Sequence, residues 1–330
     1  MFAARRLVIA AHAQHKSFNF LLKKLHVSAP LSKLDLNGVY PPISTPFTSD
    51  GKEQMDFDKL ESNLNVYSKS PLRGYLVQGS NGEYVYLSPE ERVEMVRRVR
   101  RAVPADRLVL AGSGCEATGD TVRLTAQMAE AGADAVVVVT PCYYKSGMTD
   151  AAMVAHYTAV ADASSVPVVL YSVPANTGVD LSAAAVARLA QHPNIVGIKD
   201  SAGDISKLAL MVHQTKGENF QVLAGSASFL LPALLVGCVG GICALANVLP
   251  AEVCQLQALF EAGRLEEAAA LQRRLVAPNA AVTRQLGVPG LKAAMDDHGL
   301  YGGPVRAPLL PLPDAERQRL RQVFADAGFQ

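Results

Sequence analysis

The sequence predicts an α/β fold, a closed (β/α)8 TIM barrel followed by a C-terminal helical extension. Eight short apolar segments of buried-strand character alternate with amphipathic segments between residues 38 and 244. Strict alternation favours a parallel sheet with helical crossovers, and eight strands close such a barrel. The alternative is a doubly wound open sheet, which is disfavoured because no GxGxxG motif follows the first strand.

The expected strands are apolar segments that end at glycine, proline or polar residues. They are Gly38–Ser44, Gly74–Gly79, Leu108–Gly112, Ala135–Thr140, Val166–Ser172, Ile195–Lys199, Gln221–Ala224 and Gly240–Ala244. The helices expected between them are residues 56–69, 88–102, 118–131, 149–163, 182–191, 204–215 and 226–236. Ser88 with Pro89 forms a helix-capping pattern, and Thr118 and Thr149 are similar polar starts.

Beyond about residue 246 the pattern is helical only. The helices expected there are Glu252–Ala262, Leu265–Leu275, Pro289–Asp297 and Pro313–Ala327. The first of them completes the eighth β/α unit. The sequence therefore predicts a barrel over residues 35–263 and a helical extension over residues 264–330.

The N-terminal segment differs in charge from the rest of the chain. Residues 1–34 contain six basic residues, and no acid occurs before Asp35. The segment is also apolar and hydroxyl-bearing, which is typical of a mitochondrial transit peptide; a disordered basic tail is the alternative. We expect a leader over residues 1–34 and a location in the mitochondrial matrix.

Composition excludes several classes of function. The 330 residues are 49% hydrophobic and 18% charged, as in an ordinary globular enzyme. A formal net charge of +1 gives no argument for a nucleic acid partner, and no apolar run is long enough to predict a membrane span. The five cysteines are odd in number and contain no CxxC pair, which predicts free thiols in a reducing compartment.

Reactive side chains gather where the expected strands end. In a barrel of this kind the active site is built at the C-terminal ends of the strands. The segments at those ends are Gly79–Glu83, Thr140–Tyr144, Tyr171–Gly178, Lys199–Ser201 and Ala224–Ala227. Lys199 is the most informative residue, because it ends a strand buried on both faces. Burial penalises the ammonium and favours the neutral, nucleophilic amine.

Three motifs at this rim are similar to one known family. Gly79-Ser80-Asn81-Gly82-Glu83, Tyr171-Ser172-Val173-Pro174 and Gly197-Ile198-Lys199-Asp200 stand in the order and spacing of the dihydrodipicolinate synthase / N-acetylneuraminate lyase family of pyruvate-dependent class I aldolases. The resemblance covers about residues 36–327. It is strongest to members that cleave 4-hydroxy-2-oxoglutarate, through residues Gln78–Glu83, Leu110–Glu116, Val139–Tyr144 and Ala280–Arg284.

The resemblance implies a role for each rim residue. Lys199 forms a Schiff base with the 2-keto carbon, and Tyr171 is the acid/base. Tyr143 is the tyrosine that relays protons into the pocket of an adjacent subunit, with Tyr144 as its rival. The carboxylates of the substrate are assigned to four further residues: Ser80 and Asn81 at the C1 end, Ser201 and Gly225 at the distal end.

The resemblance also implies what the chain binds. It implies reversible cleavage of 4-hydroxy-2-oxoglutarate to pyruvate and glyoxylate, as in hydroxyproline degradation, with no cofactor or metal, by a homotetramer built as a dimer of dimers. One position departs from part of the family, because Asn176 replaces the arginine that dihydrodipicolinate-forming members carry.

Other activities stay open at this point. A sibling lyase acting on a sugar keto acid and a catalytically silent keto-acid-binding barrel are the alternatives. A phosphate cradle at Gly240-Gly241 is disfavoured because no basic residue accompanies it, and a metal-dependent aldolase because the seven histidines show no ligand spacing.

Overall fold

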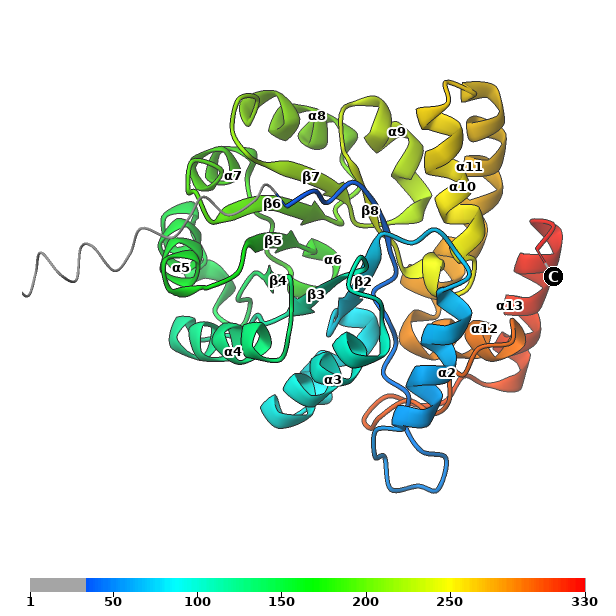
Figure 1. The fold of residues 1–330 in the computed structure, drawn as a ribbon. Coiled ribbons are helices and arrows are strands. Elements are labelled where there is room, and N and C mark those ends of the chain that lie inside the picture. Colours follow the sequence, from blue (N-terminus) through cyan, green and yellow to red (C-terminus); the bar gives the residue numbers. More distant parts are fainter. Residues whose placement is uncertain (1–33, 330) are drawn as a thin grey trace, which may run out of the picture. The chain divides into compact units, whose positions relative to one another are not determined.

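Eight parallel strands form the centre of the structure, a computed structural model that describes residues 34–329 (Figure 1). They are β1 Gly38–Tyr40, β2 Gly74–Val77, β3 Leu108–Gly112, β4 Ala135–Val139, β5 Val168–Ser172, β6 Ile195–Asp200, β7 Gln221–Ala224 and β8 Gly240–Ile242. Their order is β1-β8-β7-β6-β5-β4-β3-β2. Backbone hydrogen bonds from Ile43 N to Leu76 O (2.9 Å) and from Leu76 N to Pro41 O (3.0 Å) join β1 to β2 and close the ring. The predicted barrel is confirmed.

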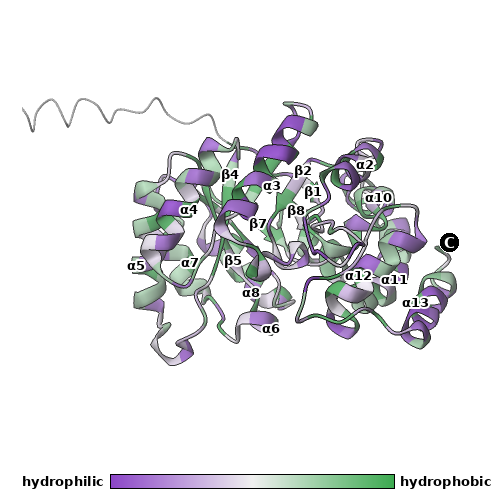
Figure 2. Ribbon diagram, turned by 90° about the horizontal axis from the view of Figure 1, so that it is seen from below, coloured by the Kyte–Doolittle hydropathy of each residue, from purple (hydrophilic) through white to green (hydrophobic). Residues whose placement is uncertain are grey.

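Burial on both faces explains the apolar character of the strands. Every residue of β2, β3, β5 and β6 is buried, including the lysine and aspartate at the end of β6. Helices cover the outside of the sheet, and the hydrophobic colouring in Figure 2 concentrates on the strands. Five strands, β1, β2, β4, β5 and β8, are shorter than expected, and for two of them the reason is that proline has no N–H to donate. β1 ends before Pro41 and Pro42, and β5 begins after Pro167.

The helices around the barrel follow the strands in turn. They are α2 Phe57–Tyr67, α3 Pro89–Ala102, α4 Thr118–Glu130, α5 Asp150–Ala163, α7 Ala183–Leu189, α8 Ile205–Gln214, α9 Leu230–Leu235 and α10 Pro250–Glu261. Ser88 and Glu91 form a complete capping box on α3, and Thr149 caps α5. Thr118, in contrast, is not a cap. It is the first residue of α4, and its hydroxyl lies 2.9 Å from His156 Nδ1.

The C-terminal extension consists of three helices and a π-helical turn. They are α11 Leu265–Ala280, the π-helix Ala281–Gln285, α12 Gly287–Asp297 and α13 Asp314–Asp326. The expectation that the first helix ends at Leu275 is wrong, since α11 continues through Pro278. The π-helix then follows, a widened turn of a rare kind that occurs mostly as a single turn within helices. Asp297 fixes α13 to α12, because its carboxylate accepts hydrogen bonds from Arg317 and Arg321.

Two further expectations can be compared with the described residues. None of the helices that residues 34–329 form is long and apolar enough to cross a membrane. All five cysteines are free thiols; Cys238, Cys243 and Cys254 are buried, and Cys115 and Cys142 are partly buried. Nearly all of the expected leader, residues 1–33, lies outside the described residues.

Candidate active site

Lys199 and Tyr171 lie side by side at the C-terminal ends of neighbouring strands. The register of the sheet pairs Tyr171 on β5 directly with Lys199 on β6. Lys199 is only 3% exposed, and its Nζ atom lies 3.9 Å from the centre of the Tyr171 ring. An amine in this position is shielded from water and close to a group that can exchange a proton.

The phenol of Tyr171 is unusually acidic for a buried tyrosine. Burial by itself raises the pKa of this group. The charge of Lys199, together with hydrogen bonding by the side chains of Ser80, Lys199 and Ser201, outweighs that effect and places the pKa of Tyr171 below its usual value. Stabilisation of the phenolate makes Tyr171 a better base at physiological pH than a free tyrosine.

Ser80 and Asn81 reach this site on a single tight turn. Residues Ser80–Gly82 form a 3-10 helical turn directly after β2, and Glu83 ends it in the left-handed conformation, with φ of 55°. Both residues are half-buried. The first N–H groups of a helical turn have no partner within the turn, so this backbone can bind a carboxylate.

Ser201 and Gly225 meet just beyond the ends of β6 and β7. Ser201 Oγ lies 3.4 Å from the Gly225 carbonyl oxygen, and Gly225 N donates to the Asp200 carbonyl oxygen at 2.8 Å. A Cβ atom on residue 225 would lie 1.9 Å from Ser201 Oγ. Glycine is therefore required for the ends of β6 and β7 to come this close.

A buried ion pair between Asp200 and Lys207 stabilises the end of β6. Asp200 is completely buried, and its Oδ2 atom lies 2.8 Å from Lys207 Nζ on α8. Lys207 also contacts Asp180 Oδ1 at 2.5 Å, and Ser172 at the end of β5 donates to the same Asp180 oxygen at 2.9 Å. The charge next to Lys199 is thus neutralised, and the ends of β5 and β6 are tied together.

Tyr143 does not reach this site within its own chain. Its side chain is 77% exposed, that of Tyr144 is 75% exposed, and the two rings meet edge to face. The backbone of this loop is nevertheless fixed, because Glu116 Oε2 accepts hydrogen bonds from Cys142 N (3.0 Å) and Tyr143 N (2.9 Å). The structure therefore brings together Lys199 and Tyr171 with Ser80, Ser201 and Gly225, which follow the ends of β2, β6 and β7, while the side chain of Tyr143 is exposed to solvent.

Comparison with known proteins agrees with this geometry. The profile of the dihydrodipicolinate synthetase family matches residues 35–327. The chain belongs to this family.

The relatives span the whole barrel and its extension. A 4-hydroxy-tetrahydrodipicolinate synthase of Methanoculleus marisnigri is 36% identical over 291 residues, which cover 88% of this chain and 99% of the relative. A probable mitochondrial 4-hydroxy-2-oxoglutarate aldolase of Emericella nidulans is 36% identical over 295 residues, covering 88% and 94%. The structure of a chloride-inhibited dihydrodipicolinate synthase of Acinetobacter baumannii, complexed with pyruvate, has a TM-score of 0.84 at 31% identity, covering 90% and 100%. The chain is thus a lyase of the class I aldolase type.

Two further residues follow strands β5 and β2 at this rim. Asn176 lies in the short helix α6, Pro174–Thr177, and is exposed to solvent. Tyr84, which the sequence does not single out, lies beside the buried Arg92, whose guanidinium carbon is 5.0 Å from the centre of the ring. Burial raises the pKa of Tyr84 to about 12 despite the Arg92 charge. Tyr84 and Tyr171 line a cavity of about 10 Å³, the size of one water molecule.

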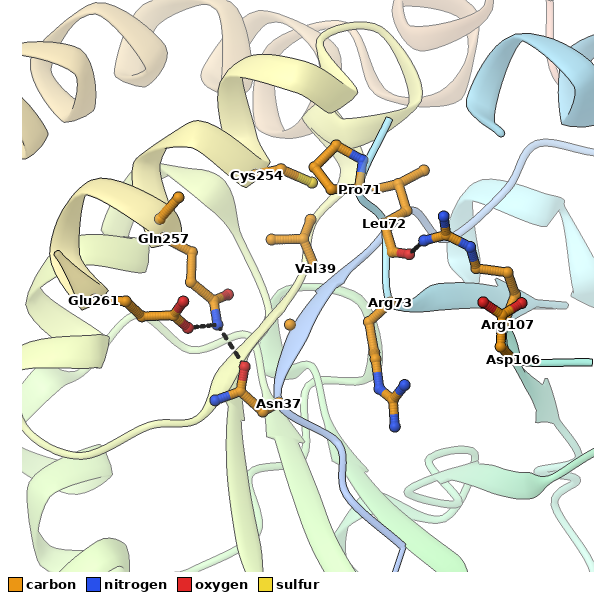
Figure 3. Close-up of a pocket in the computed structure, with 12 residues that line it drawn as sticks. Asn37, Val39, Pro71, Leu72, Arg73, Asp106, Arg107, Cys254, Gln257 and Glu261 are labelled. Atoms are coloured by element: carbon orange, nitrogen blue, oxygen red, sulfur yellow. Dashed lines mark hydrogen bonds between the residues drawn. The ribbon is translucent and has the colours of Figure 1, made fainter. Parts of the chain in front are cut away.

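A larger cavity of about 440 Å³ lies at the other end of the strands (Figure 3). Arg73 and Arg107 come from the segments that lead into β2 and β3, and Gln257 and Glu261 from α10. This cavity contains none of the predicted site residues. Since barrel enzymes react at the C-terminal ends of their strands, we assign the chemistry to the Lys199 end.

Proposed function

We propose that the protein cleaves 4-hydroxy-2-oxoglutarate reversibly to pyruvate and glyoxylate through a Schiff base on Lys199. The observation that carries this proposal is the pairing of the buried Lys199 with Tyr171, with Nζ 3.9 Å from the centre of the phenol ring. The resemblance to a relative named as a 4-hydroxy-2-oxoglutarate aldolase supports the substrate. Asn176 argues against the dihydrodipicolinate-forming alternative, because this position offers no bidentate clamp for the carboxylate of that reaction's aldehyde substrate.

The residues can perform each step of the reaction. Lys199 Nζ attacks the C2 carbonyl and water leaves, which gives a protonated imine. Tyr171 accepts the proton of the C4 hydroxyl, the C3–C4 bond breaks, and its electron pair moves into the imine as glyoxylate departs. The resulting enamine takes a proton at C3, which becomes the methyl group of pyruvate. Water then hydrolyses the imine, and this releases pyruvate and restores the free amine.

The substrate carboxylates bind on the two sides of Tyr171. In this proposal the turn of Ser80 and Asn81 binds the C1 carboxylate through its backbone N–H groups. Ser201 and Gly225 hold the distal carboxylate. The side chains of Ser80 and Ser201 both lower the pKa of Tyr171, so each carboxylate site is coupled to the acid/base.

A lyase assay on a substrate panel tests this function. Purified protein is given 4-hydroxy-2-oxoglutarate and, in parallel, sugar keto acids, and pyruvate release is measured. We expect the highest kcat/KM for hydroxyoxoglutarate and loss of activity in Lys199→Met and Tyr171→Phe. Faster cleavage of a sugar keto acid would assign the protein to the sibling lyases, and binding of pyruvate without turnover of any compound would indicate a silent barrel.

Assembly forms part of the same proposal. The exposed pair Tyr143 and Tyr144 is suited to burial against another copy of the chain, with Tyr143 entering the neighbouring pocket of a homotetramer. Mixing inactive Tyr143→Phe and Lys199→Ala chains then restores part of the activity, because a mixed pocket can contain both residues intact. A monomer by sedimentation, or no recovery after subunit exchange, contradicts this assembly.

Location in the mitochondrial matrix is proposed from the basic leader. The Emericella nidulans relative, named as a probable mitochondrial enzyme, supports the same location. Fusion of residues 1–34 to a fluorescent protein tests it: import and cleavage are expected, and a diffuse cytosolic signal contradicts it.

A further inference from the structure

The C-terminal extension places a fully buried lysine beneath the turn that carries Ser80. Lys292 on α12 is 1% exposed, and Glu83, which ends the turn, is 2% exposed with a completely buried side chain. Lys292 Nζ lies 2.6 Å from Glu83 Oε1. Charged side chains are rarely buried to this extent, and they remain so only when paired and hydrogen-bonded.

Two carbonyl oxygens hold this lysine in addition to its ion pair with Glu83. Lys292 Nζ donates hydrogen bonds to the carbonyl oxygens of Thr45 at 2.9 Å and Pro304 at 2.7 Å. The ammonium also lies 4.4 Å from the centre of the Phe47 ring. Of the three protons of this ammonium, two are donated to carbonyl oxygens, and its charge is paired with Glu83. Burial lowers the pKa of Lys292, while the charge of Glu83 opposes that shift.

The other oxygen of Glu83 is also held by the extension. Arg306 N donates to Glu83 Oε2 at 2.9 Å. The Arg306 guanidinium forms two hydrogen bonds with Glu91 at the start of α3, each 2.8 Å long. With both oxygens engaged, the Glu83 carboxylate has one orientation, and the backbone of residue 83 is fixed with it.

The turn is tied to the same assembly at two more points. Thr45 Oγ1 donates to the Gly82 carbonyl oxygen at 2.7 Å, and Thr45 O is itself an acceptor of Lys292. Glu83 N donates to the Ser80 carbonyl oxygen at 3.2 Å. A path of direct contacts therefore runs from Lys292 through Glu83 to Ser80, whose side chain helps to lower the pKa of Tyr171.

We propose that Lys292 is a positioning residue: its buried ion pair with Glu83 holds the Ser80–Asn81 turn against Tyr171, where the C1 carboxylate of the keto acid binds. This inference rests on the proposed function, because it assigns the turn to that carboxylate. It also gives the C-terminal extension a part in substrate binding, beyond covering the barrel. The alternative is that the ion pair only stabilises the fold.

Trapping with pyruvate separates these two roles. Sodium borohydride reduces the imine, so the labelled fraction of Lys199 at each pyruvate concentration gives a half-saturation value. For Lys292→Met and Glu83→Gln we expect this value to rise at least tenfold, with labelling still complete at saturating pyruvate. The matched control is Arg317→Met, which removes the ion pair with Asp297 that joins α13 to α12. Its melting temperature falls while its half-saturation value stays that of the wild type.

The double variant Lys292→Met/Glu83→Gln provides the sharpest comparison. It leaves no unpaired buried charge, so its melting temperature recovers relative to the Lys292→Met variant. A positioning role predicts that half-saturation nevertheless stays at least tenfold high, whereas a purely structural role predicts that it recovers together with stability. If neither single variant folds, the double variant and Thr45→Val, which cuts the other tether to Gly82, decide the matter. If the double variant and Thr45→Val both have the half-saturation value of the wild type, the inference is overturned. If pyruvate is not trapped on the wild type at all, the proposed function is overturned instead.

Discussion

Removal of Lys207 tests how the end of β6 is supported. Lys207→Met keeps the length of the side chain but leaves Asp200, which is completely buried, without its cation. Asp200 retains one other hydrogen bond, from Ala202 N to Oδ1 at 2.9 Å. The remaining charge is then buried and only partly compensated, which is the situation that makes the loss of one partner costly.

The expected loss of stability is about 3–5 kcal/mol, the range for breaking a buried pair. Unfolding entropy is about 2.1 cal/mol/K per residue, so in a unit of roughly 300 residues this corresponds to a fall in Tm of about 5–8 °C. Burial tends to lower the pKa of Lys207, but its bonds to Asp180 and Asp200 raise it overall. The stability that the wild type has over Lys207→Met is therefore fully present below the ordinary lysine pKa of about 10.4. It is lost as the pH rises through the raised pKa of Lys207.

Thermal unfolding at pH 8, followed by circular dichroism, measures this effect. Arg264→Met serves as the control, since it removes an exposed pair with Glu267 and should leave Tm unchanged. Lys207→Met/Asp200→Asn should recover much of the loss, because neither charge remains. A Tm within 1 °C of the wild type for Lys207→Met would refute the reasoning, as would a wild-type advantage that increases above pH 10.

Two further predictions concern the reaction centre directly. In an ultraviolet titration at 295 nm the wild type should show one tyrosine with a pKa below the usual value of about 10. This ionisation should be absent from Tyr171→Phe and should move to higher pH in Lys199→Met. A wild type that lacks it would contradict the assignment to Tyr171. Gly225→Ala should lower kcat/KM by about 10²-fold, because its Cβ atom would displace Ser201 Oγ. The control is Gly147→Ala, where a Cβ atom meets nothing within 4 Å and kcat/KM should not change. Equal activity of the two variants would count against a role for the contact between Gly225 and Ser201.

Local patterns were sufficient to predict the barrel. Segments such as Ala135–Val139 are continuously apolar because both faces of each strand are buried, and the sequence alone shows this. The same reasoning placed Lys199 and Tyr171 at one rim, since parallel strands end at the same edge. Their register, which sets one directly beside the other, depends on hydrogen bonds that the sequence does not specify.

Contacts between distant segments could not be predicted. Lys292 lies in an apolar helical pattern in which a lysine normally reaches solvent, and no local signal pairs it with Glu83. The continuation of α11 through Pro278 was missed for a related reason, because tertiary packing there outweighs the low helix propensity of proline. The role of Tyr143 stays a prediction, because the pocket that it is predicted to enter belongs to another copy of the chain.

The central claim is that Lys199 is the amine that binds the keto acid. Borohydride reduction in the presence of pyruvate, followed by peptide mass spectrometry, tests it most directly. The account predicts one covalent adduct per chain, located on Lys199 and absent from Lys199→Met. An unmodified Lys199, or an adduct on another lysine that persists in the variant, would contradict it.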